Sequence, residues 1–599
     1  MKKTTITLSL LLASSFLVAG VAGIARTRNV GALVADDGFT MVTDLETVKE
    51  IHTEQQKEYL SYEGEYVSIP EANYPDGTKH LSDPLAVNLE WNFNVPSGKT
   101  LSRYDVVVGK EADLKDGYAI KGTTATQLDV YNSYLGTNYF KVVANYADDT
   151  KDESEIKSYQ VDEVYPRNIK IDGMTNCRDM GGARVLESGG KIKQGLIYRT
   201  SSTSSWAYGR GAVPDTITTA GKEELFTRLG CKTEINVNNS GSKQDGVQNY
   251  VEAYMYYDSG KHHLYRNAEP LKEVFHALSD INNYPIFYHC RIGTDRTGLC
   301  AIMISGLLGV PKNLIYQDYL FSNFGNIQEK RYIGEKAGRD NILNYINDLD
   351  QFPGEKFQNK VYNYLLSIGV PAEELNSIID ILTEGTKAEG NDNYQEVIMA
   401  EDFDADGTEM KTIPETATGN ASRAHPKKYY TLGEGQSVSM NFDAKYDGQA
   451  KLIAYLGSTD SSSNKKINES ISVMYDGYEV EIDELTFADV GFGSGDSRTY
   501  YSAVVLGTVD VIKGSTDIEI TGVANNLNIG AVAVIAPEKV SADDPDPIPE
   551  PGSSSEPDAP VNPAPAKKGC GGSIIAASSL LGVMAVAGVT FFFIKRKDK

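Results

Sequence analysis

The chain has 599 residues, more than one hydrophobic core can organise, so we expect several domains. Its formal net charge is -25, which excludes broad binding of nucleic acid or anionic lipid, because both partners require basic surfaces. The five cysteines are few and odd in number, which argues against a disulfide framework.

The N-terminus predicts export. Lysines at positions 2 and 3 precede an apolar run over 6–21 that ends in small residues. This arrangement is typical of a secretory signal peptide, which we place at 1–24. An uncleaved membrane anchor is the alternative, although the run is short for a membrane span. Both interpretations put the bulk of the chain outside the cell.

Residues 65–163 predict an all-β domain. Short alternating runs, such as 87–93 (VNLEWNF) and 138–146 (NYFKVVANY), are separated by Gly, Asp and Asn turns. With Trp91 in an early strand, this order resembles a fibronectin type III or similar immunoglobulin-like sandwich. Trp91 is then expected in the core between two sheets, without a binding role.

The chemistry is concentrated in 288–300 (YHCRIGTDRTGLC), between an apolar strand over 283–288 and a buried helix over 298–308. Cys290 and Arg296 stand at the two ends of this loop. Unsatisfied N–H groups and the dipole at a helix N-terminus favour an anion there. The same field stabilises a thiolate at Cys290, and the planar guanidinium of Arg296 suits two phosphate oxygens. The loop is therefore predicted to bind phosphate.

The segment HCRIGTDRTG resembles the HCxxGxxR(S/T)G signature of cysteine-dependent tyrosine and dual-specificity phosphatases. An NCRDMGG block at 176–182 also resembles the NxRDxGG motif of bacterial secreted tyrosine phosphatases. The resemblance implies an α/β phosphatase domain, placed at 165–387, in which Cys290 attacks phosphorus and Arg296 binds the transition state without a metal or cofactor. It also implies phosphate-binding and supporting residues: Arg291, Ile292, Gly293, Thr294, Thr297 and Gly298 bind phosphate, and His289, Asn176, Arg178 and Asp179 support the loop.

Asp295 lies inside the loop, where its negative charge opposes phosphate binding. In the resembled family the loop commonly reads HCxxGKDRTG and its aspartate is a candidate general acid, so we assign that role to Asp295. An aspartate from another loop, Asp245 or Asp258, is the alternative. Arg199 is predicted either to face the site or to bridge to Asp179, a choice that the sequence leaves open.

Two departures from the family pattern affect this prediction. Thr294 stands where a lysine is common, and 234–239 (EINVNN) stands where a strand usually ends in Asp-Leu-Arg. Loss of the lysine removes positive charge beside the phosphate, which favours phosphotyrosine-like substrates over multiply phosphorylated inositol lipids. Asn236 and Asn238 replace an expected ion pair and put the surroundings of the loop in doubt.

A second all-β domain is predicted over 395–538. Its opening Ala-Glu-Asp, the paired strands of 506–521 and the closing LNIGAVAVI resemble a carbohydrate-binding jelly-roll module. Such a module would make a cell-surface or host glycan a further partner. Glu401 matches an early calcium-ligand position, but Gly530 falls where a late aspartate is usual, which argues against a calcium site.

The C-terminal part predicts a membrane anchor. A spacer rich in Pro, Ser and acidic residues covers 541–569. An uncharged apolar run over 574–594 is long enough to cross a bilayer, and the basic tail 595–599 would lie in the cytoplasm. The architecture suggests a single-pass protein on a Gram-positive bacterial surface.

The predicted fold class is therefore an α/β cysteine-phosphatase domain between two all-β sandwiches, with a signal peptide and a C-terminal transmembrane helix. The predicted function is a cell-surface phosphatase that hydrolyses phosphotyrosine-like phosphomonoesters, on proteins or small molecules, through a phosphocysteine. Inositol phosphates or phosphoinositides are alternative substrates. The alternative function is a surface adhesin or a binder of carbohydrate or phosphorylated ligands, built on a degenerate phosphatase scaffold.

Overall fold

The structure is a computed structural model that describes residues 38–203, 216–256, 262–337, 342–388, 393–460, 464–493 and 498–539. These residues belong to one compact unit, Met1–Val540. No helix within the described residues is long and apolar enough to span a bilayer. The predicted signal peptide, spacer, transmembrane helix and tail lie outside the described residues, so all four stay predictions.

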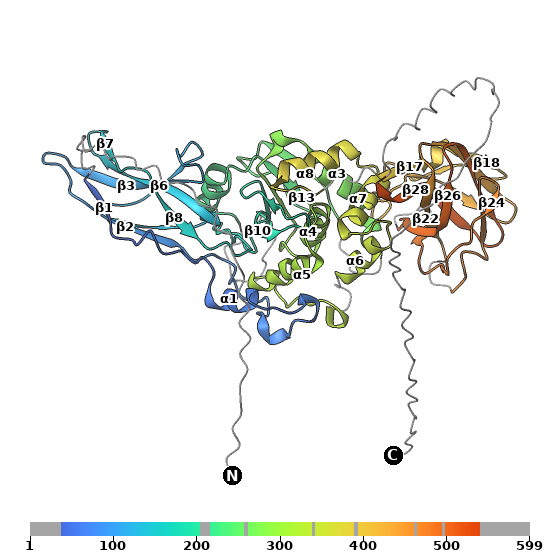
Figure 1. The fold of residues 1–599 in the computed structure, drawn as a ribbon, viewed down its shortest axis with the longest axis horizontal. Helices are drawn as coiled ribbons and strands as arrows, with labels where there is room; N and C mark the ends of the chain where they lie inside the picture. Colours follow the sequence, from blue (N-terminus) through green and yellow to red (C-terminus); the bar gives the residue numbers. More distant parts are fainter. Residues whose placement is uncertain are drawn as a thin grey trace, which may run out of the picture. The chain divides into compact units, whose positions relative to one another are not determined.

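The N-terminal sandwich consists of two antiparallel sheets whose inner faces share one core (Figure 1). Trp91 is 1% exposed in that core and meets Tyr104 edge-to-face at 5.3 Å between ring centroids, which confirms its expected core position. One sheet contains β1 (Phe39–Met41), β2 (Val87–Phe93) and β5 (Gln127–Val130), and the other contains β3 (Leu101–Gly109), β4 (Tyr118–Lys121), β6 (Gly136–Tyr146), β7 (Lys151–Glu153) and β8 (Lys157–Val161).

The segment between β1 and β2 contacts both domains: Ile51 is buried in the sandwich core, whereas the residues after it pack on the central domain. It contains α1 (Glu54–Leu60), η1 (Tyr66–Ser68) and η2 (Glu71–Asn73). Tyr59 and Tyr66 are buried in the central core, and the Tyr59 hydroxyl donates to the Gln317 carbonyl at 2.8 Å. This segment therefore joins the two domains through aromatic residues that are buried against the central one.

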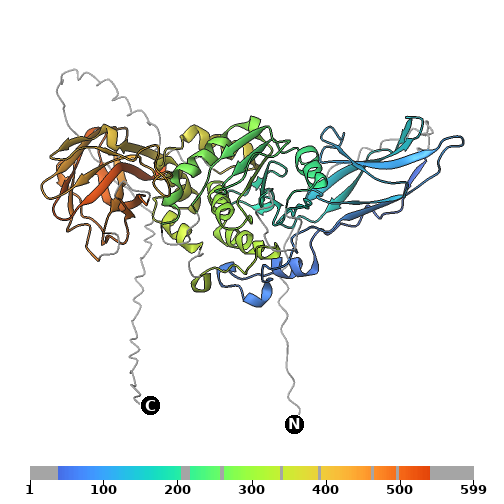
Figure 2. The same ribbon diagram turned by 180° about the vertical axis from the view of Figure 1, so that it is seen from behind.

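The central domain, coloured teal to yellow in Figure 2, is built on a five-stranded sheet. The strand order in this sheet is β14-β13-β15-β12-β9. Its four strands other than β9 run parallel, so their carboxyl ends meet at one edge of the sheet. The strands are β9 (Arg178–Asp179), β12 (Ile197–Thr200), β13 (Thr233–Asn236), β14 (Asn249–Glu252) and β15 (Ile286–His289), with a smaller sheet of β10 (Gly182–Val185), β11 (Lys191–Ile192) and β16 (Thr383–Glu384).

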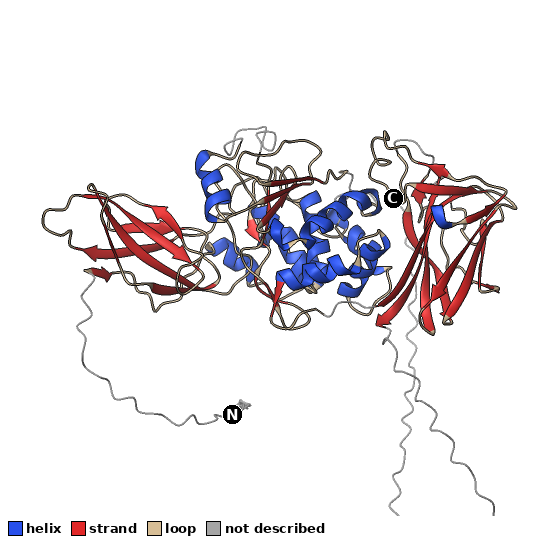
Figure 3. Ribbon diagram, turned by 90° about the horizontal axis from the view of Figure 1, so that it is seen from above, coloured by secondary structure: helices blue, strands red, loops and turns tan. Residues whose placement is uncertain are grey.

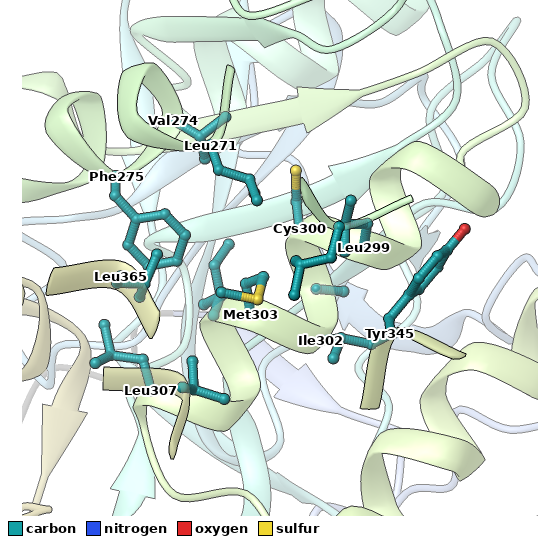
Figure 4. Close-up of a cluster of buried hydrophobic side chains, with 14 of the residues drawn as sticks. Leu271, Val274, Phe275, Leu299, Cys300, Ile302, Met303, Leu307, Tyr345 and Leu365 are labelled. Carbon is teal, nitrogen blue, oxygen red and sulfur yellow. The ribbon is translucent and has the colours of Figure 1, made fainter. Parts of the chain in front are cut away.

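Helices of the described chain are concentrated in this domain (Figure 3). Apart from its first residue, α4 (Asp295–Leu307) is buried along its whole length, and Leu299, Cys300 and Met303 lie among side chains from α3 and α7 (Figure 4). The other helices are α2 (Thr219–Lys222), α3 (Ala268–Ser279), α5 (Lys312–Phe321), α6 (Leu343–Asp350), α7 (Phe357–Ser367) and α8 (Ala372–Leu382), with shorter segments η4 (Glu223–Arg228), η5 (Tyr265–Asn267), η6 (Ile281–Asn283), η7 (Ser322–Phe324) and η8 (Glu335–Ala337).

The C-terminal module, residues 393–539, is a second two-sheet sandwich. One sheet contains β17 (Asn393–Met399), β19 (Lys411–Thr412), β20 (Lys428–Leu432), β22 (Gly448–Ser458), β25 (Gly491–Phe492), β26 (Ser502–Val511) and β28 (Leu527–Lys539). The other contains β18 (Asp404–Asp406), β21 (Ser437–Ala444), β23 (Ile471–Tyr475), β24 (Tyr478–Glu479) and β27 (Gly514–Gly522), and η9 (Ala400–Asp402) follows β17.

Strand β22 divides its side chains between two cores. Leu452, Ala454 and Leu456 point into the core of the module, whereas the alternate residues Ile453 and Tyr455 belong to the core of the central domain. Strand β28 shows the same alternation. Because successive side chains of a strand point to opposite faces, one face of this sheet is packed against the central domain.

Candidate active site

The predicted phosphate loop follows β15 and leads directly into α4 at the carboxyl edge of the central sheet. Gly293 has a φ of +73°, which favours glycine. A Cβ atom at this position would also lie 2.6 Å from the Thr200 carbonyl oxygen. Both conformation and space therefore require glycine at the bend of the loop.

Cys290 is 2% exposed at the start of the loop, and its backbone N–H donates to the Thr297 hydroxyl at 2.7 Å. Burial raises the pKa of its thiol, and Asp295 also raises it. The positive charge of Arg296 and a side-chain hydrogen bond with Thr297 lower the pKa by more, so it lies below its ordinary value. A larger fraction of this thiol is therefore the nucleophilic thiolate at neutral pH.

The carbonyl groups of the loop are held from behind. Asn176 Nδ2 donates to the carbonyl oxygens of Gly293 at 2.9 Å and Ile292 at 3.3 Å, and Arg199 Nη2 donates to the Gly293 oxygen at 3.0 Å. The N–H of a trans peptide points opposite to its C=O. Fixing these carbonyls outward therefore turns the N–H groups of Gly293 and Thr294 toward the anion side of the loop.

A buried carboxylate, that of Asp318, holds Arg178 and Arg199 in place. Asp318 on α5 accepts from Arg178 Nε at 2.8 Å and pairs through its other oxygen with Arg199. Burial raises the pKa of Asp318, but the two arginines outweigh it and hold that pKa far below its ordinary value. Arg178 also donates to Asn176 Oδ1 at 2.6 Å, so one charge network positions the loop-supporting amide.

Arg199 does not bridge to Asp179, which was one of its two predicted roles. Asp179 pairs with Arg167 at 2.7 Å and accepts from the N–H groups of Gly181 and Gly195 at 2.8 and 2.7 Å. Arg199 instead contacts the loop, as its other predicted role required. Asn176 and Arg178 therefore act beside the loop, whereas Asp179 organises the chain behind them.

The unusual strand end at 234–239 forms its own contacts to the loop. Glu234 Oε1 lies 2.8 Å from His289 Nε2, and both side chains are buried. His289 Nδ1 lies 3.2 Å from the Cys290 carbonyl oxygen, which fits the predicted orienting role of its ring. Asn239 Oδ1 lies 3.5 Å from Arg296 Nη1. Glu234 and Asn239 thus contact His289 and Arg296, although this segment departs from the family's Asp-Leu-Arg pattern.

A pocket of about 250 Å³ opens at this site. Arg291 and Arg296 line it from the loop, while Asn238 and Asn239 come from the segment after β13. Its remaining lining residues are Met255, Tyr256 and Arg423. Arg423 belongs to the C-terminal module, which the sequence had given no part in this site.

Comparisons with known proteins agree with this geometry. The model of the tyrosine phosphatase family matches residues 215–384, which include the loop, α4 and the helices after it. We call the central domain, in which the matched residues lie, the phosphatase domain. A protein of Cupriavidus necator, provisionally named a tyrosine-protein phosphatase, is 25% identical over 192 residues, covering 27% of this chain. The chain spans 65% of the length of that relative.

Solved structures resemble parts of the chain at low identity. The core catalytic domain of the PP-IP phosphatase SIW14 from S. cerevisiae is 18% identical, with a TM-score of 0.18, over 26% of this chain and 80% of that one. A family 35 carbohydrate binding module from Clostridium thermocellum is 15% identical, with a TM-score of 0.18, over 24% of this chain and 97% of that one.

Asp295 in the phosphatase domain forms a two-pronged ion pair with Arg331. Arg331 Nε lies 3.0 Å from Oδ1 and Nη2 lies 3.1 Å from Oδ2, and both side chains are largely buried. This partner was not anticipated, because it lies beyond α5. Asp245 is exposed and does not line the pocket, and Asp258 lies outside the described residues.

The remaining loop residues have mainly structural contacts. The Thr294 hydroxyl is fully buried and lies 3.3 Å from Asn176 Nδ2, so only its backbone N–H faces the anion side. Gly298 lets Tyr319 approach, since a Cβ atom there would lie 3.2 Å from that ring. Ile292 is 8% exposed, whereas Arg291 lines the pocket.

Proposed function

We propose that the chain is a cysteine-dependent phosphatase that hydrolyses phosphomonoesters through a phosphocysteine. The observation that supports this most strongly is the Cys290 thiol of lowered pKa inside a loop whose carbonyls Asn176 and Arg199 hold outward. Such a loop presents N–H groups and one guanidinium to a phosphate without any rearrangement.

In the first step the Cys290 thiolate attacks phosphorus, a P–S bond forms and the P–O bond to the leaving group breaks. Arg296 and the loop N–H groups bind the equatorial oxygens as negative charge spreads over them. In the second step water attacks phosphorus, the P–S bond breaks, and inorganic phosphate and the thiolate are released. The hydrogen bond with Thr297 stabilises the departing sulfur.

Asp295 stays our candidate for the proton donor in the first step. Its ion pair with Arg331 fixes the position of the carboxylate at the start of α4, one residue before Arg296. In the first step it donates its proton to the leaving oxygen, and in the second step it accepts a proton from the attacking water. Asp295 would then carry the proton released by the water molecule.

Leaving-group dependence tests the role of Asp295. A general acid matters most for a leaving oxygen of high pKa, so Asp295→Asn should slow hydrolysis of an alkyl phosphate by about 100-fold or more and that of p-nitrophenyl phosphate much less. Asp245→Asn is the matched control and should change neither rate. Equal losses on both substrates would assign Asp295 to holding the loop with Arg331, with no role as an acid.

One of the two grounds for the alternative of a degenerate scaffold is weaker than the sequence suggested. The alternative rested on the flanking β-modules and on the missing Asp-Leu-Arg end of β13, yet Glu234 and Asn239 contact His289 and Arg296 from that segment. We therefore favour catalysis over passive capture of phosphorylated ligands. Phosphotyrosine-like esters are the proposed substrates, with inositol phosphates as the alternative.

The decisive experiment compares the full chain with Cys290→Ser in hydrolysis of p-nitrophenyl phosphate and a phosphotyrosine peptide, under reducing conditions. We expect the substitution to lower kcat by at least about 1,000-fold, because serine is a far weaker nucleophile than a thiolate. Cys231→Ala is the control, since Cys231 is a buried core thiol outside the site. Activity that survives in Cys290→Ser would overturn the mechanism.

We also propose that the chain acts on the cell surface, anchored by the apolar run 574–594. The proposal is supported by the sequence of the two termini, which lie outside the described residues. Proteolysis of intact cells should release a fragment carrying phosphatase activity, whereas a chain ending before 574 should appear in the medium. Resistance of the ectodomain to protease in intact cells would contradict an outward orientation.

A further inference from the structure

Arg423 stands out among the residues that line the phosphatase pocket, because it belongs to the C-terminal module. It lies in a long connection between β19 and β20 that extends from 413 to 427. This connecting loop reaches across to the phosphatase domain and places one cationic side chain beside Arg291 and Arg296. The pocket is therefore composed from two modules of the chain.

The side chain of Arg423 is fixed in this position. Its Nε donates to the Tyr254 carbonyl at 2.9 Å, its Nη1 donates to the Gly419 carbonyl, and its guanidinium carbon lies 5.5 Å from the Tyr256 ring centroid. Its backbone carbonyl accepts from the N–H of Glu269 in the first turn of α3 at 3.1 Å. An arginine with this many contacts presents its charge to the pocket with little further loss of side-chain freedom.

The connecting loop itself is anchored on the phosphatase domain. His425 Nδ1 pairs with Glu269 at 2.8 Å, while Ala421 and Ala424 are fully buried in the phosphatase core. The Tyr455 hydroxyl of β22 also lies 2.6 Å from Ser367 Oγ of α7. These contacts join the module and the loop to the catalytic domain, so Arg423 is part of the pocket.

The charge of the pocket exceeds the requirement of a single phosphate. Three arginines line it, and none of its described lining residues carries a carboxylate. Burial lowers the pKa of Arg423, Tyr256 raises it and Arg296 lowers it again, which shows that the two guanidinium groups feel each other's charge. Like charges held together in a partly buried site are stabilised by a bound anion.

We propose that Arg423 is a substrate-binding residue of the phosphatase site and selects small phosphomonoesters that carry a second anionic group. The inference rests on the proposed phosphatase function and, within it, favours esters with a second anion, which include the inositol phosphates given above as the alternative substrates. Arg296 and the loop hold the phosphate that is transferred, and Arg423 pairs with a neighbouring phosphate or carboxylate on the same molecule. The positive charge that Thr294 does not supply within the loop is thus supplied by the C-terminal module.

A substrate series on one ring tests this selection in the full chain. Phenyl phosphate carries no second anion, 3-carboxyphenyl phosphate carries a carboxylate, and benzene-1,3-diyl bisphosphate carries a second phosphate. Arg423→Gln should lower kcat/KM for the substrates with a second anion by about 10- to 100-fold, mainly by raising KM. For phenyl phosphate, kcat/KM should fall by less than about threefold. The carboxylate substrate and the bisphosphate distinguish a carboxylate partner of Arg423 from a phosphate partner.

Two further variants separate binding from folding. Arg423→Lys retains the charge and should recover part of the lost kcat/KM. Lys428→Gln removes a positive charge from the same module at a half-exposed position outside the pocket lining, and should leave the ratio of the substrates unchanged. Equal losses on phenyl phosphate and on the substrates with a second anionic group, or no loss on any of them, would overturn the proposal.

A binding measurement keeps this test independent of turnover. In the Cys290→Ser background, calorimetric titration with benzene-1,3-diyl bisphosphate should give a Kd that rises about 10- to 100-fold on adding Arg423→Gln. If the wild-type chain hydrolyses none of the esters but this binding difference appears, the phosphatase function fails and Arg423 stands as an anion-binding residue. If hydrolysis occurs and the difference is absent, Arg423 has no part in substrate selection.

Discussion

The two β-sandwiches that flank the phosphatase domain are attached to it in different ways. The N-terminal sandwich has a separate core, and no residue after Val161 is among its buried members in the described chain. Its junction is largely polar: Arg167 donates to the carbonyls of Ser133 and Asn132 at 3.0 and 2.7 Å, and Leu135 N–H donates to Gln194 at 2.9 Å. The C-terminal module shares its second apolar face with the phosphatase core.

This difference indicates two cooperative units. A shared apolar core couples the unfolding of both partners, whereas a polar junction resembles a transient interface and couples them weakly. We therefore expect the phosphatase domain and the C-terminal module to unfold together. The N-terminal sandwich is expected to unfold in a transition of its own.

The largest expected difference in folding and activity is between two deletions, each of which removes one sandwich. A chain that ends before β17 exposes the apolar surface that Tyr455, Tyr501 and Ile535 cover, so we expect insoluble or unfolded protein without activity. Excision of 87–161 should leave a folded phosphatase, because Leu85 N–H and Asp162 N–H bond to the carbonyls of Ile51 and Lys49 and so lie near each other.

Thermal unfolding followed by calorimetry and turnover of p-nitrophenyl phosphate are the measurements for these two deletions. The control is the full chain under the same conditions. A soluble and active phosphatase domain without the C-terminal module would contradict the expectation that these two domains fold as one unit.

Single aromatic residues sharpen the same contrast. Tyr455→Ala and Trp91→Ala each remove a large side chain that is 1% exposed, and each should destabilise its own unit by about 3–5 kcal/mol. Tyr455→Ala should lower the midpoint at which activity is lost on heating, whereas Trp91→Ala should leave that midpoint unchanged. The measurement is residual activity against temperature beside calorimetry, and a parallel shift of activity in both variants would contradict separate units.

A buried histidine at each junction gives a smaller, pH-dependent effect. Burial lowers the pKa of His52 by more than its hydrogen bond with the Pro166 carbonyl raises it. Burial likewise lowers the pKa of His425 by more than Glu269 raises it. The unfolded chain therefore binds the proton first as the pH falls below about 6.5. Stability is fully present above that pH and declines below it by about 1.4 kcal/mol per pH unit for each histidine, until the folded pKa is reached.

Denaturant unfolding between pH 7 and pH 5 measures this loss for each transition. His52→Gln should remove the contribution of His52 from the pH dependence of the N-terminal transition, and His425→Gln should remove that of His425 from the phosphatase transition. A histidine variant that alters the pH dependence of both transitions equally would show that the units are coupled.

The strand–loop–helix around Cys290 was predictable because its information is local. The apolar strand, the spacing of Cys290 and Arg296 and the glycine bend all lie within one short segment, and the structure confirms this arrangement. The helix begins at Asp295, earlier than expected, because the last residues of the signature form its first turn. The support by Asn176 and Arg178 also followed from the motif.

The partners that complete the site were not predictable, because each lies far along the chain. Asp318, Arg331 and Glu234 are ordinary charged residues in sequence, and only the fold brings them to Arg199, Asp295 and His289. One signal for the packed module was present, however. The unbroken apolar runs 452–456 and 531–536 indicate strands buried on both faces, which a free-standing sandwich does not need.

The sequence alone determined the chemistry of the loop, because a nucleophile, a guanidinium and a helix N-terminus at fixed spacing can form a phosphate site with few other requirements. Only the tertiary structure decided the charge of the pocket. Arg423 reaches it because β22 and β28 bury their second face on the phosphatase domain and carry the connecting loop with them. Such a contribution depends on how two apolar surfaces pack, and the spacing of residues within one motif contains no record of that packing.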